Sequence, residues 1–308
     1  MNHKQVWQQA GPTTNWEQSP RELFGRVDDD EWFWLNTEGY RELPDLRRVL
    51  PGLPDEQLQS QTIGSSGDKA LSEAFLAYTL FKQLYESHVG PIGKCQRILD
   101  FGCGWGRILR FFLKDLDAQK LWGIDPSEER IQACQATNRW CQFQKSSLFP
   151  PSDLHGESCD LIYGYSVFSH LAERTQQLWL TEFHRLLRPG GLLVMTTWHR
   201  EFIEQCQQVR NDSDFPCEPN WRKELVTKFL DQQKCLADYD SGRFCFDEYD
   251  RVRSAWAFVN GEPFYGEACV PRGYVLDRWT DRFEFVDFIT DRKLCPQNVI
   301  VVRKRRAP

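Results

Sequence analysis

The glycine-rich segment over 97–107, RILDFGCGWGR, contains residues whose types and spacing suit the binding of a nucleoside. Three glycines alternate with other residues in it: Gly102, Gly104 and Gly106. A loop of residues without Cβ atoms lets the backbone approach a ligand closely. The dinucleotide-binding fingerprint would place its third glycine at position 107, where this chain has Arg107. Asp125 ends the next predicted strand, where a carboxylate can accept hydrogen bonds from both ribose hydroxyls.

The elements that must position this loop alternate between strands and helices. Short apolar runs predict strands over 98–101, 121–124, 141–144, 161–163 and 192–197. Helices are predicted over 68–88 and 105–114, from 127 onward and over 175–187, with a turn over 188–191. A helix over 273–281 and an antiparallel pair of strands over 283–289 and 298–303 complete the pattern. This order predicts an α/β fold with a doubly wound, Rossmann-like sheet, mostly parallel with an antiparallel last strand.

The chain divides into three parts around this core. Residues 1–66 contain repeated Leu-Pro pairs, which predict short helices joined by fixed bends. Residues 67–198 and 271–308 carry the alternating elements, and residues 199–270 form an insertion without regular periodicity. Ligands of open α/β sheets bind beyond the carboxyl ends of the strands. Because the insertion leaves from such an end, we expect it and the N-terminal segment to form a cap, with the insertion over the acceptor site.

Composition excludes several classes of protein. The net charge of −6 has the wrong sign for a protein that binds nucleic acid through its surface. No apolar run approaches the roughly 20 residues of a membrane helix, and the N-terminus lacks the order of a signal peptide, so we expect a cytoplasmic protein. The eleven cysteines include no C-x-x-C pair, which predicts reduced thiols and no metal site.

Four stretches of the chain resemble the class I S-adenosylmethionine-dependent methyltransferases: ILDFGCGWGR, LWGIDPS, CDLIYGYSVFSHL and FHRLLRPGGLLVMTTW. The resemblance covers roughly 70–197, and SVFSHL and LLRPGG are similar to a bacterial subgroup associated with small-molecule and glycan biosynthesis. It implies S-adenosyl-L-methionine as methyl donor and S-adenosyl-L-homocysteine as product.

The resemblance also implies roles for individual residues. The glycine loop would hold the amino acid and sugar of the donor, and Asp125 would hold its ribose. Many members have an aspartate beside the adenine, where this chain offers Ser146, Ser147 and Leu148. Further cofactor candidates are Asp100, which could instead cap the following helix, Arg107, which could instead form a surface ion pair, and Ser166 after the fourth strand.

Candidates for the acceptor side lie where predicted strands and the insertion end. Methyl transfer needs alignment and exclusion of water, and a base only when the acceptor proton has a high pKa. The candidates, in chain order, are Tyr165, His199, Tyr265 and Glu267. Tyr165 could instead be a packed phenol, His199 a surface histidine, and the Tyr265–Glu267 segment a simple turn. His170 is expected to be a hydrogen-bonded structural histidine.

The leading hypothesis is therefore a methyltransferase that acts on an O, N or S atom of a small-molecule acceptor. A protein or peptide methyltransferase is the alternative within the same fold. From other classes, a nucleotide-cofactor oxidoreductase and a non-catalytic protein that binds S-adenosylmethionine stay open. No nucleic-acid or membrane partner is expected, and the sequence makes no prediction of oligomeric state.

Overall fold

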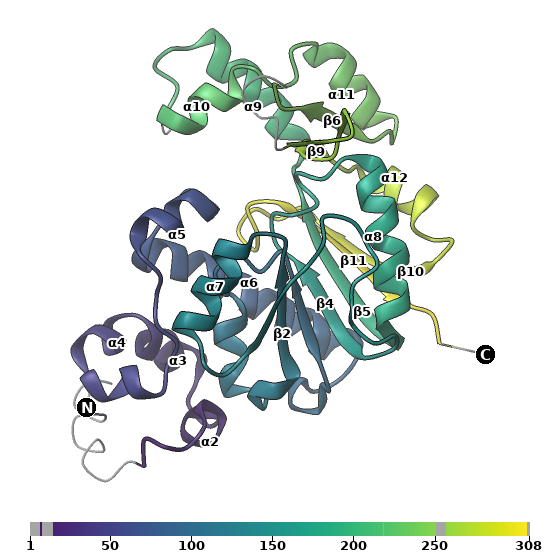
Figure 1. The fold of residues 1–308 in the computed structure, drawn as a ribbon. Helices are drawn as coiled ribbons and strands as arrows, with labels where there is room; N and C mark the ends of the chain where they lie inside the picture. The colour runs from purple at the N-terminus through teal and green to yellow at the C-terminus, as the bar shows by residue number, and fades with distance from the viewer. Residues whose placement is uncertain (1–6, 8–14, 218, 251–256, 307–308) are drawn as a thin grey trace. The chain divides into compact units, whose positions relative to one another are not determined.

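The computed structural model describes residues 7, 15–217, 219–250 and 257–306. Seven strands form one sheet in the order β10-β11-β5-β4-β1-β2-β3 (Figure 1). Their bounds are β1 Ile98–Phe101, β2 Leu121–Asp125, β3 Gln142–Lys145, β4 Cys159–Gly164, β5 Leu187–Thr197, β10 Phe283–Ile289 and β11 Asn298–Lys304. β1 pairs in parallel with β2 and β4, and β2 with β3, whereas β11 is antiparallel to β5 and β10. The predicted fold class is confirmed.

The chain forms two compact units, of which the first comprises residues 1–148 and 158–163. Its helices are α2 Pro20–Phe24, α3 Asp29–Asn36, α4 Glu38–Glu42, η2 Pro44–Arg48, α5 Glu56–Ile63, α6 Gly67–His88, η3 Ile92–Lys94, η4 Leu109–Lys114, η5 Ala118–Lys120 and α7 Glu128–Thr137. The short N-terminal helices and the long α6 agree with the prediction. Phe75, Tyr78 and Phe81 of α6 pack on aromatic rings of η4 and β4, which gives this unit a buried aromatic core.

The predicted helix over 105–114 is only partly present. Residues 104–108 form turns, and the helix η4 begins at Leu109 with 3₁₀ geometry. Gly106 has φ of +76°, which is incompatible with a right-handed helix, so regular helical bonding cannot start inside the loop.

The second unit comprises residues 149–157 and 164–308. Its helices are α8 Glu173–Leu186, α9 Arg200–Asn211, α10 Pro219–Leu225, α11 Gln232–Asp240 and α12 Arg272–Arg278. Its short strands are β6 Cys245–Glu248, β7 Phe258–Val259, β8 Glu262–Pro263 and β9 Gly266–Cys269. Two predictions are wrong here. The residues predicted as a turn over 188–191 belong to β5, and the insertion, predicted to be irregular, contains α9, α10 and α11 (Figure 1).

The insertion has its own apolar core. Phe202, Ile203 and Cys206 lie on one face of α9 and are buried against Leu225 and Phe229. α9 has few apolar residues among many Gln and Glu, and its neighbours α10 and α11 are short. The buried residues of α9 nevertheless recur at helical spacing, a signal that the sequence analysis missed, and the helices of the insertion depend on one another for burial.

The last part of the insertion returns along the body of the second unit. β9 pairs with β6, and its residues also bond to the segment that follows β4: Gly266 N–H donates to His170 O at 2.7 Å, and Ala268 N–H to Ser169 O at 2.7 Å. Thr197, at the end of β5, donates its hydroxyl to Ala268 O at 3.2 Å. These bonds fix the direction in which the side chains of β9 point.

Among the described residues no helix has the length and apolarity required to cross a membrane.

Candidate active site

The glycine loop of the first unit has a backbone that favours glycine at each alternate position. Gly102, Gly104 and Gly106 have φ of +70°, +55° and +76°, in the left-handed region. A Cβ atom at Gly104 would also lie 2.9 Å from Cγ2 of Thr62, which belongs to α5. The N-terminal segment therefore covers the loop at this point, and a side chain at position 104 would have no room.

Asp125 ends β2 with its carboxylate directed at the same loop. Its Oδ2 accepts a hydrogen bond from Gly104 N–H at 3.1 Å, and its Oδ1 accepts one from Ser127 N–H at 2.9 Å. Asp125 is 2% exposed, and burial raises the pKa of its carboxyl group, against the opposing effects of Arg130 and the two amides. Each oxygen keeps acceptor capacity beyond these bonds. The carboxylate can therefore hold the loop and still accept from a ligand.

Asp100, in β1, is a second buried carboxyl group near the loop. It is 3% exposed, and burial raises its pKa to about 7, although the Tyr163 hydroxyl and the Arg107 guanidinium favour its ionised form. The Tyr163 hydroxyl is itself buried and makes no well-aligned hydrogen bond to any residue that the structure describes. A buried hydroxyl without such a partner beside a buried acid marks a place where a polar ligand would add bonds.

Arg107 is directed at α6. Its guanidinium donates to Ala70 O at 3.3 Å and lies 3.7 Å from the Glu73 carboxylate. Arg107 thus forms an ion pair while it is itself buried, whereas the alternative from sequence was an ion pair at the surface. This contact joins the loop to the helix that precedes the sheet.

The residues predicted to frame the adenine follow β3. Ser146 N–H donates to the main-chain O of Asp125 at 3.0 Å, so this segment leaves the sheet beside the predicted ribose ligand. Ser147 is exposed and Leu148 is 40% exposed. Together with the glycine loop and Asp125, the segment fits a nucleoside whose sugar and base contact adjacent strand ends.

Among the described acids of the second unit, Glu267 of β9 is the most enclosed, at 1% exposed. Its Oε2 accepts from Trp198 Nε1–H at 2.5 Å and lies 3.3 Å from His170 Nδ1, and its Oε1 accepts from the Tyr249 hydroxyl at 2.7 Å. Three donors therefore surround one buried carboxylate. We name Glu267, His170, Trp198, Tyr249 and Tyr265 the acid–aromatic cluster.

His170 lies between this acid and an aromatic ring. Its imidazole stacks on Tyr265, with ring centroids 5.1 Å apart and planes inclined by 12°. Nδ1 also lies 3.0 Å from Gly266 O. Burial alone would lower the pKa of His170, but the Glu267 carboxylate and the bond to Gly266 outweigh it, so the pKa is raised. The sequence prediction of a hydrogen-bonded histidine holds, and its partner is a predicted site residue.

Ser166 has an unusual backbone at the start of the segment after β4. Its φ is +57°, which is strained for a residue with a Cβ atom. Its N–H donates to Thr196 Oγ1 at 2.7 Å, and its hydroxyl accepts from Gln297 Nε2 at 3.1 Å. Its neighbour Tyr165 is half-buried. The main chain of Ser166 is thus held by Thr196 and its side chain by Gln297, two residues that the sequence analysis did not select.

His199 is paired with an acid that does not belong to the acid–aromatic cluster. As the residue before α9, it places Nδ1 3.0 Å from Glu201, which is also paired with Arg292. Burial and the Arg292 charge lower the pKa of His199, against the effect of Glu201. The structure thus brings Tyr265 and Glu267 together around His170, while His199 pairs with a different acid.

Sequence reasoning did not select Tyr249 and expected His170 to be a structural histidine, and the structure places both beside Glu267. The only local signal was the position of His170 shortly after a strand end, because its partners come from the far end of the insertion. Trp256, which we expected in the cap, lies outside the described residues.

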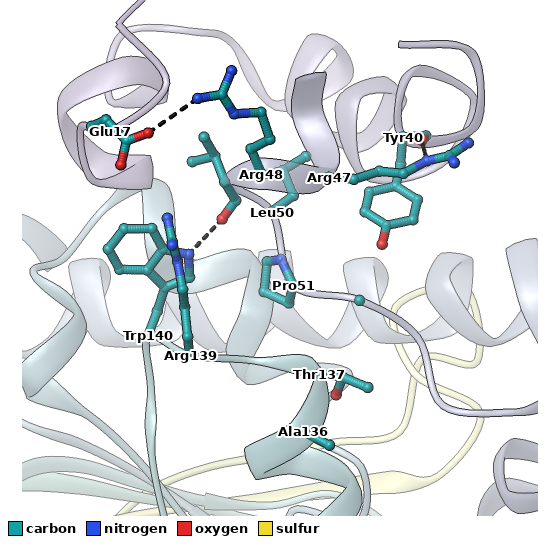
Figure 2. Close-up of a pocket in the computed structure, with 12 residues that line it drawn as sticks. Glu17, Tyr40, Arg47, Arg48, Leu50, Pro51, Ala136, Thr137, Arg139 and Trp140 are labelled. Atoms are coloured by element: carbon teal, nitrogen blue, oxygen red, sulfur yellow. Dashed lines mark hydrogen bonds and ion pairs between the residues drawn. The ribbon is translucent and has the colours of Figure 1, made fainter. Parts of the chain in front are cut away.

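A pocket of about 550 Å³ in the first unit lies away from the predicted cofactor residues, none of which lines it (Figure 2). Arg48 in its wall donates to Glu17, and Arg47 donates to the main-chain oxygens of Tyr40 and Arg41. Trp140 donates to Val49 O at 2.5 Å. These bonds make the pocket part of the contact between the N-terminal segment and the segment after α7.

Residues 99–193, which contain the glycine loop, Asp125 and the strands up to β5, match the profile of a protein family described as "Methyltransferase domain". The matched residues begin at β1 and so include each cofactor element described above. These residues form a methyltransferase domain, and the chain is an S-adenosylmethionine-dependent methyltransferase. The methyltransferase uses S-adenosylmethionine as donor and releases S-adenosylhomocysteine. It is therefore neither a nucleotide-cofactor oxidoreductase nor a non-catalytic protein that only binds S-adenosylmethionine.

Solved structures similar to the methyltransferase share little sequence with it. An S-adenosylmethionine-dependent methyltransferase from Mesorhizobium loti is 16% identical, with 74% of this chain and 100% of that chain covered and a TM-score of 0.44. The PH0226 protein from Pyrococcus horikoshii OT3 is 14% identical, with 87% and 99% covered and a TM-score of 0.46. The plantazolicin methyltransferase BpumL in complex with SAH is 16% identical, with 93% and 98% covered and a TM-score of 0.46.

Proposed function

We propose that the methyltransferase acts on a small-molecule acceptor and that the acid–aromatic cluster forms part of its acceptor site. The enclosure of Glu267, at 1% exposed, carries this proposal. A protein acceptor needs an open groove in which a peptide backbone can lie, whereas the polar groups of the cluster are recessed behind aromatic rings. Aromatic walls with a few placed polar groups are typical of small-molecule sites.

The donor would be held by the residues of the first unit. We propose that the backbone of Gly102, Gly104 and Gly106 approaches its amino acid and sugar, and that Asp125 accepts hydrogen bonds from its ribose. Ser146, Ser147 and Leu148 would contact the adenine, and Asp100, Arg107 and Ser166 would complete the polar surroundings. When bound, S-adenosylmethionine supplies a methyl group activated by a positively charged sulfur.

The second unit would exclude water and orient the acceptor. Tyr265 and Glu267, both predicted from sequence, lie in the cluster, and the bonds from β9 to Ser169 and His170 hold them in place. This supports the insertion over 199–270 as the acceptor cap, with the segment over 1–66 covering the donor side through Thr62. Roles for Tyr165 and His199 in the acceptor pocket stay predictions.

The proposed place of action is the cytoplasm. All eleven cysteines are free, including Cys245 and Cys269, which lie opposite each other in β6 and β9. Free thiols in this number are typical of proteins in a reducing compartment.

The acceptor class is tested by incubating the protein and isotopically methyl-labelled S-adenosylmethionine with two fractions of a cell extract, one of metabolites and one of proteins. We expect label to enter the metabolite fraction. Label that enters only the protein fraction would overturn the small-molecule proposal and favour a peptide or protein acceptor. An Asp125→Ala variant, which should bind the donor poorly, serves as the control: the label incorporated in its presence is background that does not depend on the donor site.

A further inference from the structure

The hydrogen bonds of His170 determine which of its ring nitrogens carries a proton. Nδ1 faces only acceptors: Gly266 O at 3.0 Å and Glu267 Oε2 at 3.3 Å. A nitrogen between a carbonyl and a carboxylate must donate, so in the neutral imidazole the proton is on Nδ1. Nε2 is then an unprotonated acceptor, which is the state a general base requires.

The second nitrogen of the imidazole, Nε2, is free of the contacts that hold Nδ1. Within the part of the chain that the structure describes, Nε2 has no hydrogen-bond partner, and it is not among the fully buried polar atoms that lack one. The side chain is 13% exposed. Tyr265 stacks on one face of the ring, and the Trp198 ring lies edge-on to it, with ring centroids 6.1 Å apart.

His170 lies in the segment that follows β4 in the chain. β4 pairs with β1 in parallel, with Tyr163 opposite Asp100. The segment that follows β4 therefore starts from the same strand-end edge as the glycine loop. In open α/β sheets this edge is where ligands bind.

We propose that His170 is the general base of the reaction, that Glu267 is its positioning residue, and that the accepting atom is the oxygen of an alcohol or phenol. This inference rests on the proposed function. A neutral amine or a thioether needs no base, whereas a hydroxyl group has a proton of high pKa that must leave as the new bond forms. A buried acid that holds a histidine in one tautomer is suited to the hydroxyl case.

In the proposed methyl transfer, the hydroxyl oxygen forms a bond to the methyl carbon. The bond from that carbon to the donor sulfur breaks, with its electron pair staying on sulfur. The hydroxyl proton passes to His170 Nε2. The imidazolium that results is stabilised by the Glu267 carboxylate, and the proton then leaves to solvent.

Other charged and titratable groups face the cluster and would influence the titration of His170. The Tyr249 hydroxyl donates to Glu267, and the Lys228 ammonium lies 4.2 Å from the centroid of the Tyr249 ring. Asp247, opposite Glu267 in the β6–β9 pair, lies 3.8 Å from Lys228. The rate should rise with pH as His170 loses its proton, with a midpoint above the ordinary histidine value.

The first experiment measures the histidine itself and needs no acceptor. The full chain is labelled with ¹⁵N in its histidine rings, and His170 is assigned with a His170→Gln variant. We expect the neutral ring to be protonated on Nδ1, and Glu267→Gln to lower the pKa of His170. His184→Gln, at a histidine of α8 outside the cluster, should leave the His170 signals unchanged. A ring protonated on Nε2, or a titration that Glu267→Gln does not move, would overturn the proposal.

The second experiment identifies the methylated atom in the product that the wild-type enzyme forms from the metabolite fraction. We expect a methyl ether, and a rate that falls by about 10²–10⁴-fold in His170→Gln while the affinity for S-adenosylhomocysteine is unchanged. The Glu267→Gln variant should shift the pH–rate profile, which loss of a purely structural bond would not do. A labelled metabolite methylated on nitrogen or sulfur, or normal turnover by His170→Gln, refutes the hydroxyl inference alone. Absence of any labelled metabolite refutes the proposed function instead.

Discussion

Replacing Asp125 with alanine is the most direct test of the donor site. The carboxylate is 2% exposed and bonds to Gly104 N–H and Ser127 N–H, so it both shapes the glycine loop and faces the proposed ribose position. Two charged hydrogen bonds to ribose hydroxyls would each contribute roughly 1.5–3 kcal/mol. Their loss amounts to about 3–6 kcal/mol, or about 10²–10⁴-fold in affinity, since about 1.4 kcal/mol corresponds to a factor of ten.

The variant also leaves two backbone N–H groups unpaired, so a matched control is needed. Asp160 accepts hydrogen bonds from Gln96 N–H at 2.6 Å and Arg97 N–H at 3.2 Å, but it lies at the start of β4, away from the glycine loop. Asp160→Ala therefore removes comparable backbone bonds without removing a ligand contact. Its stability should fall, and its affinity for S-adenosylhomocysteine should not.

The assay is isothermal titration calorimetry with S-adenosylhomocysteine on both variants and the wild type, with unfolding midpoints recorded alongside. We expect strong loss of affinity in Asp125→Ala only. Equal affinity in Asp125→Ala and wild type would refute the ribose role, and equal losses in both variants would show that the effect comes from general destabilisation.

Three further predictions concern other parts of the two units. Gly104→Val should abolish binding of S-adenosylhomocysteine and lower the unfolding midpoint, because position 104 has positive φ and a Cβ there meets Thr62 at 2.9 Å; calorimetry that finds normal binding would contradict this. Asp100→Asn should stabilise the ligand-free protein, because the pKa of Asp100 is about 7 in the folded protein and 3.8 ordinarily. The free-energy cost of burying the charged carboxylate is therefore largest above pH 7 and declines as the pH falls toward 4. Thermal melts across this range should show the gain shrink at low pH, and a constant gain would mean that the charge is not its cause. Tyr265→Leu removes the ring stacked on His170, a contact worth about 0.5–1.5 kcal/mol, and should reduce methyl transfer at unchanged donor affinity; normal turnover would exclude Tyr265 from the acceptor site.

The elements of the proposed donor site could be predicted because they are consecutive in the chain. Strand β1, the loop with Gly104, and Asp125 at the end of β2 follow one another, and each has a local signal: an apolar run, alternating glycines, an acid after a strand. The helix after the loop was predicted to begin too early, at residue 105, whereas it begins at Leu109. Apolar periodicity does not show that Gly106 has a positive φ, which prevents a helix from starting there.

The contacts among the proposed acceptor-site residues could be predicted only in part. Tyr265 and Glu267 were selected because they end the insertion, but nothing in the sequence indicates that they meet His170 and Tyr249. His199 was favoured because it begins the insertion, yet its partner is the nearby Glu201. The helices of the insertion also escaped prediction: the apolar residues of α9 recur at helical spacing, but only the tertiary structure shows the short helices α10 and α11 that cover them.

By itself, then, the sequence determined the order of strands and helices, the place of the glycine loop and the acid that faces it, because these depend on neighbouring residues and on steric rules for the backbone. Only the tertiary structure decided that Glu267 and His170 form a pair. That pairing depends on main-chain bonds from Gly266 and Ala268 to the segment after β4, which bring together parts of the chain separated by the whole insertion. A buried carboxylate is tolerated there because three donors surround it, and donors from distant segments leave no local trace in the sequence.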